Sequence, residues 1–234
     1  MKQLRLESII LAAGIALLGL FIYWGLCNIK GSDRTVTVRG LAEREVKADR
    51  VIWPITYNTA GDDLQAIYKD VNTANEKIYN FLLHNGLKPE EITISAPAVT
   101  DLYADRYSNR QNVGERYRAT STLTVVSTQV DRVRDRMKRM GELLKQGVAI
   151  SPADYSSAVQ YDFTSLNKIK PAMIEEATKN ARAAAHKFAT DSESGLGKIK
   201  SATQGLFSIE DRDQYTPYIK RVRVVTTVEY YLDS

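Results

Sequence analysis

The stretch IILAAGIALLGLFIYWGL, residues Ile9–Leu26, decides how the chain is placed, because it divides a short basic segment from a large polar remainder. No charged residue occurs in the 22 residues from Ser8 to Ile29. At a helical rise of about 1.5 Å per residue they reach about 33 Å, enough to cross the hydrocarbon core of a bilayer. Tyr23 and Trp24 lie near the end, where aromatic rings favour lipid headgroups. The pattern predicts a transmembrane helix.

Other interpretations of this stretch remain open. A cleaved signal peptide fits less well, because the apolar run is longer than a usual signal core and no A-x-A-like site follows it. A buried core helix fits poorly, because the stretch is apolar on every side. Cys27 is the only cysteine, so it excludes an internal disulfide. Leu26 is a poor match for the small residue that precedes a lipidated cysteine.

The sequence therefore predicts an anchor, or an uncleaved signal, in residues 1–29, a linker in 30–34, and a domain in 35–234 that is large enough for two lobes. The 32 basic and 28 acidic residues leave a net charge of +4, which selects no partner, and no nucleic acid is expected. More cations follow the anchor than precede it, which favours a cytoplasmic domain, but long domains cross membranes largely regardless of charge.

The remainder of the chain alternates between the periodicities of strands and helices. We expect strands at 35–39, 50–59, 92–103, 117–127, 157–163, 199–209 and 221–232, helices at 62–85, 130–146 and 171–190, and an exposed hairpin loop at 104–116. The order is ββαββαβαββ, which predicts an α+β fold with helices packed on a mostly antiparallel or mixed sheet.

Single residues refine this prediction. Gly40 is expected at a bend or bulge, and Pro54 at a sheet edge or bulge, because proline has no N–H to donate. Pro171 suits the first turn of the third helix. Gly86 and Gly147 are expected to end the first two helices.

Helical spacing also predicts which faces are buried. In the first helix apolar residues, beginning with Leu64 and Tyr68, recur at steps of three and four residues and are expected to face the core. At its start, Asp62 with Gln65 resembles a capping box. For the other two helices the expected inward residues are Val130, Val133, Met137, Met140 and Leu144, then Ala177, Ala181, Ala184 and Phe188. The alanines imply close approach of the third helix to its neighbour, and Gly195 and Gly197 are expected to stop it.

The sequence offers little material for catalysis. His84 and His186 have no metal-ligand partner at a useful spacing, and the adjacent pairs Asp62/Asp63, Glu90/Glu91 and Glu175/Glu176 do not face each other on a helix. No nucleophile elbow or phosphate loop occurs; Ser194-Gly195-Leu196-Gly197 lacks the Lys-Ser/Thr ending. We therefore expect no catalytic, cofactor-binding or metal-binding residues.

Two alternatives are retained. One is an enzyme whose site is assembled from separated loops, for example by Glu43, Asp49 and Tyr57. The other is a binder of a ligand or an anionic surface through the basic helix 130–146, using Arg132, Arg136 and Arg139, with Tyr103, Tyr107 and Tyr117 as stacking groups. Asp131, Asp135 and Glu142 on that helix favour a solvated charged surface instead.

Several stretches together resemble the SIMPL domain family. These are Val36-Thr37-Val38-Arg39-Gly40 followed by Glu43, Val46, Asp49 and Val51, then Gly114–Thr120 with Tyr117 and Ala119, Ala177–Ala185, and Leu196-Gly197-Lys198-Ile199. The similarity covers nearly all of the chain after the anchor. Ala48, where the family usually has proline, and Arg39, in place of a small polar residue, depart from the pattern.

The resemblance implies an α+β ectodomain exported across the bacterial cytoplasmic membrane, with no established enzymatic activity and no catalytic residues to transfer. Members are described as periplasmic, outer-surface or stress-associated. The leading hypothesis is a single-pass, non-enzymatic protein of the inner membrane with its domain in the periplasm. It would act as a homo-oligomer or by binding an envelope protein, and the small-residue face around Ala181 is the expected subunit contact.

Overall fold

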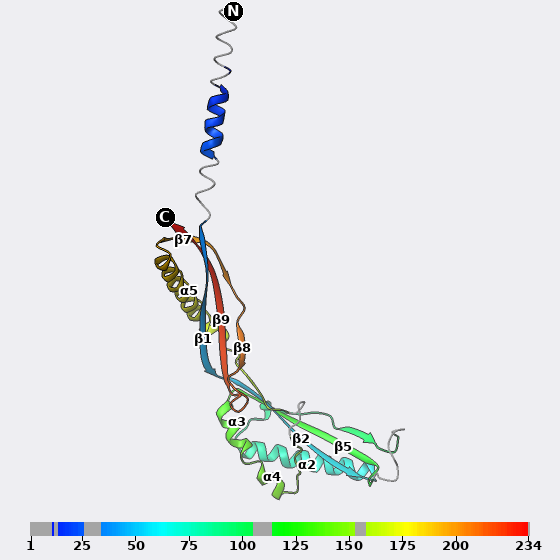
Figure 1. The fold of residues 1–234 in the computed structure, drawn as a ribbon. Coiled ribbons are helices and arrows are strands. Elements are labelled where there is room, and N and C mark those ends of the chain that lie inside the picture. Colours follow the sequence, from blue (N-terminus) through cyan, green and yellow to red (C-terminus); the bar gives the residue numbers. More distant parts are fainter. Residues whose placement is uncertain (1–10, 12–13, 26–33, 105–113, 153–157, 234) are drawn as a thin grey trace, which may run out of the picture. The chain divides into compact units, whose positions relative to one another are not determined.

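The computed structural model describes residues 11, 14–25, 34–104, 114–152 and 158–233 (Figure 1). The chain divides into two compact units. Unit 1 comprises Met1–Arg44, Asn167–Ser208 and Arg223–Ser234, and unit 2 comprises Glu45–Leu166 and Ile209–Val222. Strands and helices are mixed in both, which confirms the α+β class, and β5 pairs antiparallel with β2, β3 and β4, as do β2 with β6 and β7 with β9.

The predicted membrane stretch Ile9–Leu26 lies partly outside the described residues, as do Cys27 and most of the linker. Residues 14–25 are helical, and their large apolar side chains, including Phe21 and Trp24, are exposed. Within the described part of the chain, no helix has both the length and the apolar character needed to cross a bilayer.

Unit 1 contains most of a sheet with the strand order β1-β9-β7; β8, which also pairs with β9, lies mainly in unit 2. The strands are β1 (Thr35–Lys47), β7 (Gly195–Gln204), β8 (Ser208–Asp211) and β9 (Ile219–Asp233). Helix α5 (Leu166–Asp191) packs on this sheet through a small core of Val38, Ala181, Ala185, Val228 and Tyr230. Because this core is small, it depends on close packing of helix and sheet rather than on large buried side chains.

β1 and α5 lie very close together at Gly40. The buried residues of α5 recur every fourth position: Met173, Ala177, Ala181, Ala185 and Ala189. A Cβ atom on Gly40 would lie 1.9 Å from the carbonyl oxygen of Ala177 and 2.4 Å from the nitrogen of Ala181. The close approach predicted from the alanines is confirmed. Gly40, predicted at a bend or bulge, lies inside β1, where only a glycine leaves room for the helix.

The buried stripe also corrects the predicted face of α5. Ala184 is only half-buried and Phe188 is 61 % exposed, because a stripe with steps of four residues passes through Ala185 and Ala189 instead. Ala181 is fully buried in unit 1, so it is not available as the expected subunit contact.

Unit 2 is built on a sheet with the order β3-β5-β2-β6, in which β4 also pairs with β5. The strands are β2 (Arg50–Gly61), β3 (Ile92–Ile94), β4 (Ala98–Asp101), β5 (Tyr117–Ser127) and β6 (Gln160–Asp162). The central pair β2 and β5 keeps one register from Val51 opposite Ser127 to Gly61 opposite Tyr117. Helix α2 (Leu64–His84) packs on the sheet through Ile78 and Leu82, which lie in one cluster with Val51, Ile55 and Leu123.

Three predicted elements are interrupted. The expected strand 92–103 is β3 and β4, the expected strand 199–209 is β7 and β8, and the expected helix 130–146 is α3 (Val130–Met137) and α4 (Gly141–Lys145). The turn between α3 and α4 shifts the helical phase, so Leu143 is buried and Leu144 is exposed. Val130 and Val133 are buried as predicted.

The prolines and helix ends are partly as expected. β2 lies between β5 and β6, so the predicted edge strand is wrong and the register with β5 continues through Pro54 without a bulge; β6 pairs only with Arg50–Ile52 and does not reach Pro54. Pro171 lies inside α5, which begins five residues earlier, so its predicted first-turn position is wrong.

Gly86 and Gly147 have positive φ angles of 83° and 80°, as expected for residues that end helices. Glu193, at φ 53°, takes that conformation after α5, whereas Gly195 and Gly197 lie in β7. The N-cap of α2 is Asp63 rather than Asp62.

Replacing Gly40 with alanine should destabilise the fold by about 1–3 kcal/mol, because the methyl group would force α5 away from β1. Denaturant unfolding of the full-length chain in detergent, followed by circular dichroism, measures this. Gly141→Ala is the matched control, because a Cβ atom there meets nothing within 4 Å. Equal midpoints for the two variants would contradict the close contact.

Candidate functional site: an apolar groove in unit 2

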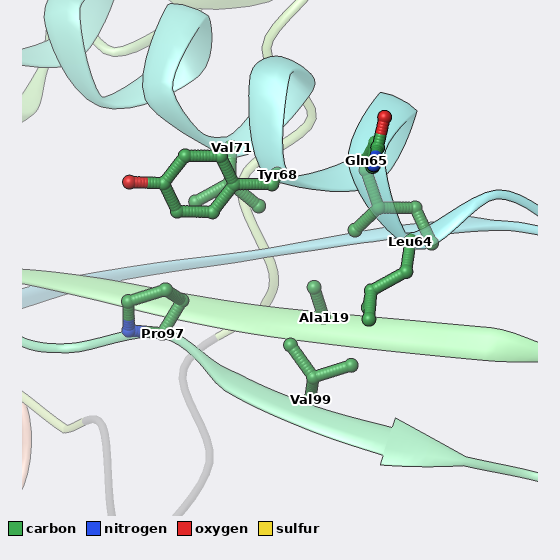
Figure 2. Close-up of a pocket in the computed structure, with 8 residues that line it drawn as sticks. Leu64, Gln65, Tyr68, Val71, Pro97, Val99 and Ala119 are labelled. Atoms are coloured by element: carbon green, nitrogen blue, oxygen red, sulfur yellow. The ribbon is translucent and has the colours of Figure 1, made fainter.

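A groove of about 550 Å³ opens between α2 and β4, over β5 (Figure 2). Figure 2 shows side chains of α2 on one side, Pro97 and Val99 on the other, and Ala119 of β5 between them. The lining residues are Leu64, Gln65, Ile67, Tyr68, Val71, Pro97, Val99 and Ala119. Only Gln65 and the Tyr68 hydroxyl carry polar side-chain atoms, so the groove is suited to apolar groups.

The groove follows from a change of residue size along β5. Leu123 and Val125 fill the space beneath α2, whereas Ala119, on the same face, is too small to do so. Ile67 and Val71 pack on Ala119 and are buried. Leu64 and Tyr68 stay 49 % and 63 % exposed, and Val99 is 48 % exposed. Contiguous exposed apolar side chains around a hollow are typical of interaction sites.

Acidic side chains gather at the α2 N-terminal end of the groove. Asp62 accepts a hydrogen bond from the Arg116 N–H at 3.0 Å, and the Arg116 guanidinium donates to Asp101 at 2.9 Å. Asp63 accepts from the Gln65 N–H at 2.8 Å and caps α2. The hydrogen bond from Arg116 is the main cause that lowers the pKa of Asp101. Of these three carboxylates, Asp101 pairs with the Arg116 guanidinium, whereas Asp62 and Asp63 accept from backbone N–H groups, so the charged side chains named here make this end of the groove negative.

Sequence reasoning missed this site because it placed Leu64 and Tyr68 in the core. The available signal was the width of the apolar stripe: four of the eight residues from Leu64 to Val71 are large and apolar. The strand that faces this part of α2 is β5, which has only Ala119 at this position. That Ala119 faces α2 becomes visible only in the tertiary structure.

Of the residues named for a loop-built enzyme site, Tyr57 has a structural role in unit 2. The Tyr57 hydroxyl donates to the Val71 carbonyl at 2.7 Å and lies 3.1 Å from Oδ1 of Asn75, which also accepts from Ser121. This polar cluster is buried, and burial raises the pKa of Tyr57. Tyr57 therefore holds α2 on the sheet. Glu43 belongs to unit 1, whereas Asp49 and Tyr57 belong to unit 2.

Asp49 binds the backbone just before α5. Its carboxylate accepts hydrogen bonds from the Thr164 N–H at 2.7 Å, the Thr164 hydroxyl at 3.0 Å and the Ser165 N–H at 2.8 Å. Burial acts to raise the pKa of Asp49, but these hydrogen bonds outweigh it and hold the pKa below its usual value. The neighbouring Ala48 N–H donates to the Tyr218 carbonyl at 2.9 Å, a bond that a proline there could not make.

The basic helix is largely engaged within unit 2. Arg132 donates to the Gly86 carbonyl at 3.3 Å, Arg136 pairs with Asp135 at 3.4 Å, and the Arg134 guanidinium lies 3.3 Å from the centre of the Tyr218 ring. Tyr103 and Tyr117 flank Arg116 instead, and Tyr107 lies outside the described residues. The expected combination of basic helix and stacking tyrosines is therefore not formed by the described residues.

The histidines stay within their own helices: Nδ1 of His84 is 2.6 Å from the Asn80 carbonyl oxygen, and the His186 carbonyl accepts from the Thr190 hydroxyl. Among the residues that the structure describes, no group of three or more His, Cys, Asp or Glu side chains is placed to hold a metal ion.

Asp49 should make the free energy of unfolding depend on pH. Because its folded pKa is lowered, its contribution is fully present above the unfolded value of about 3.9 and is lost as pH falls through the folded pKa. Asp49→Ala should cost about 1 kcal/mol at pH 7, as expected for a lost cap, and much less at pH 2.

Urea midpoints of the full-length chain at the two pH values measure this effect. Asp70→Ala, at an exposed carboxylate of α2, is the control and should change neither midpoint appreciably. A cost for Asp49→Ala that is the same at both pH values would show that its charge does not matter.

The residues that resembled a family have structural explanations: Gly40 admits α5, Asp49 caps the entry to α5, and Ala119 floors the groove. The family model named SIMPL, described as a protein of unknown function (DUF541), matches residues 36–228. No curated protein shows significant similarity to the chain.

Proposed function

Because the chain belongs to the SIMPL family, whose biochemical role is unknown, we propose that it is a non-enzymatic, membrane-tethered protein that acts by binding another protein chain through the groove of unit 2. The observation that carries this proposal is the apolar lining of the groove, bordered by the exposed side chains of Leu64, Tyr68 and Val99. Such a lining gives no group for bond making, but it provides binding free energy when apolar surface is covered.

The shape of the groove favours a protein partner over a small molecule. It is open along one side and has few polar atoms to orient a small ligand, whereas small-molecule sites usually combine enclosure with a few placed polar groups. Tyrosine is among the residues that dominate protein interfaces, and Tyr68 stands at the rim. The partner is a second copy of the chain or another envelope protein.

The location proposed is the bacterial cytoplasmic membrane, with one crossing and residues 35–234 on the periplasmic side. The support is the uncharged run from Ser8 to Ile29 and the exposed apolar surface of the helix at 14–25. A tether of this kind would concentrate the groove near other envelope proteins and lower the entropy cost of meeting them.

A photo-crosslinking amino acid placed at position 64 should give a specific adduct in intact membranes, because that position borders the groove. Tyr68→Glu should reduce the adduct at least about tenfold by placing a charge on the apolar rim. Position 188 is the control site, since Phe188 is also an exposed apolar residue but lies in unit 1. The proposal fails if position 64 gives no adduct, or one that Tyr68→Glu leaves unchanged.

Protease added to spheroplasts should digest residues 35–234 while the cytoplasmic membrane is still closed. Immunoblotting of the full-length chain, beside a cytoplasmic marker that must stay intact, follows the digestion. Digestion only after the membrane is opened would place the domain in the cytoplasm and contradict the proposed location.

A further inference from the structure

We infer that the groove is one half of a contact between two copies of this chain, in which β7 of one copy adds as a strand to the open edge of β4 in the other. The inference rests on the proposed function and names the partner of the same site. It follows from two unpaired strand edges of opposite charge, one in each unit.

The first edge belongs to β4. In the described part of the chain β4 pairs only with β5, with Ala98 opposite Thr120 and Asp101 opposite Tyr117. The Leu102 N–H donates to the Arg116 carbonyl at 2.8 Å. In an antiparallel pair every second residue forms hydrogen bonds with the neighbouring strand, so the even-numbered residues of β4 bond to β5. Val99, an odd-numbered residue, therefore directs its N–H and C=O away from β5. The Val99 side chain meanwhile lines the groove.

An open strand edge beside an apolar groove under a helix is the geometry used for binding by strand addition. Main-chain hydrogen bonds supply affinity, and the groove accepts alternate side chains of the added strand. Here β4 offers the edge, and α2 with Ala119 offers the groove (Figure 2). The occupant should therefore be an extended segment with an exposed apolar side chain.

The second edge belongs to β7, which has such a side chain. Its neighbour among the described strands is β9 alone, and every residue from Lys198 to Gln204 is exposed. Ile199 is 53 % exposed and is the large apolar side chain of this stretch. An exposed strand edge of this kind is a template for pairing with another chain.

Charge selects which edges pair. Lys198 and Lys200 flank Ile199. Lys200 pairs with Glu229 of β9 at 3.3 Å, whereas Lys198 is exposed, so two β7 strands would bring their Lys198 charges together and repel. The groove end carries Asp62, Asp63 and Asp101, of which Asp101 pairs with the Arg116 guanidinium. Because β7 is basic and the groove end is acidic, β7 of one copy complements β4 of another better than it complements itself.

The contact joins different surfaces of the two copies, since β7 belongs to unit 1 and β4 to unit 2. Such a contact repeats from copy to copy, and it closes into a ring or continues as a filament. The single-pass tether proposed above would confine such an assembly to one membrane surface.

Charge reversal tests the contact in the full-length chain in detergent micelles, by light scattering after size exclusion at several concentrations. The wild-type chain should associate with increasing concentration, and less so in high salt. Lys198→Glu and Asp62→Lys should each weaken association about tenfold or more, and the double variant should recover most of it. Lys187→Glu, at an exposed lysine of α5, is the matched control and should associate like wild type.

A mixing experiment tests the two edges directly. One batch carries Thr100→Cys on β4 and the other Ser201→Cys on β7, both with Cys27→Ser, and a short bis-maleimide should link them only when the batches are mixed. Val99→Pro should reduce the linked product, because it removes the outward N–H while keeping an apolar side chain.

Absence of the mixed product, or a double variant that fails to recover, overturns the inference. If Tyr68→Glu removes the membrane adduct while Lys198→Glu leaves it unchanged, the groove binds a partner other than β7. The inference then fails and the proposed function stands.

Discussion

The fold of unit 1 depends on the contact between Gly40 and the Ala177–Ala181 turn of α5. A glycine in β1 and alanines at every fourth position of α5 let a helix backbone lie directly on a strand. Dispersion forces fall steeply with separation, so a small core can be stable only if its surfaces touch throughout. Larger residues at these positions would bury more area each, but they would separate the two layers.

Unit 2 shows the opposite use of a small residue. Its core is filled by large side chains, including Trp53, Ile78, Leu82 and Leu123. Ala119 continues the same face of β5; Ile67 and Val71 of α2 pack on it, and a hollow remains beside them. Small residues therefore allow a close helix–strand contact in unit 1 and leave a groove in unit 2, depending on which residues of the neighbouring helix face them.

Polar groups mainly fix the ends of elements and the positions of helices. Asp63 caps α2, Asp49 caps the approach to α5, and the buried Tyr57, Asn75 and Ser121 hold α2 against the sheet. The acidic groove end and Lys198 of β7 are different, because they lie beside strand edges that no other described strand covers. This local contrast carries more information about a partner than the net charge of +4 does.

The sequence by itself determined the α+β class, the family, the strand at 117–127, the glycines that end two helices and the close approach implied by the alanines of α5. These features follow from short-range patterns: periodicity, turn chemistry and side-chain size. Only the tertiary structure decided that Gly40 lies within a strand, that Leu143 rather than Leu144 is buried, and that Phe188 faces outward.

It also decided that Leu64 and Tyr68 border a groove instead of filling a core. A pattern shows that a side chain is apolar and which neighbours share its face. Whether that face is covered depends on residues far along the chain, such as Ala119 opposite Val71, and the sequence does not specify that pairing.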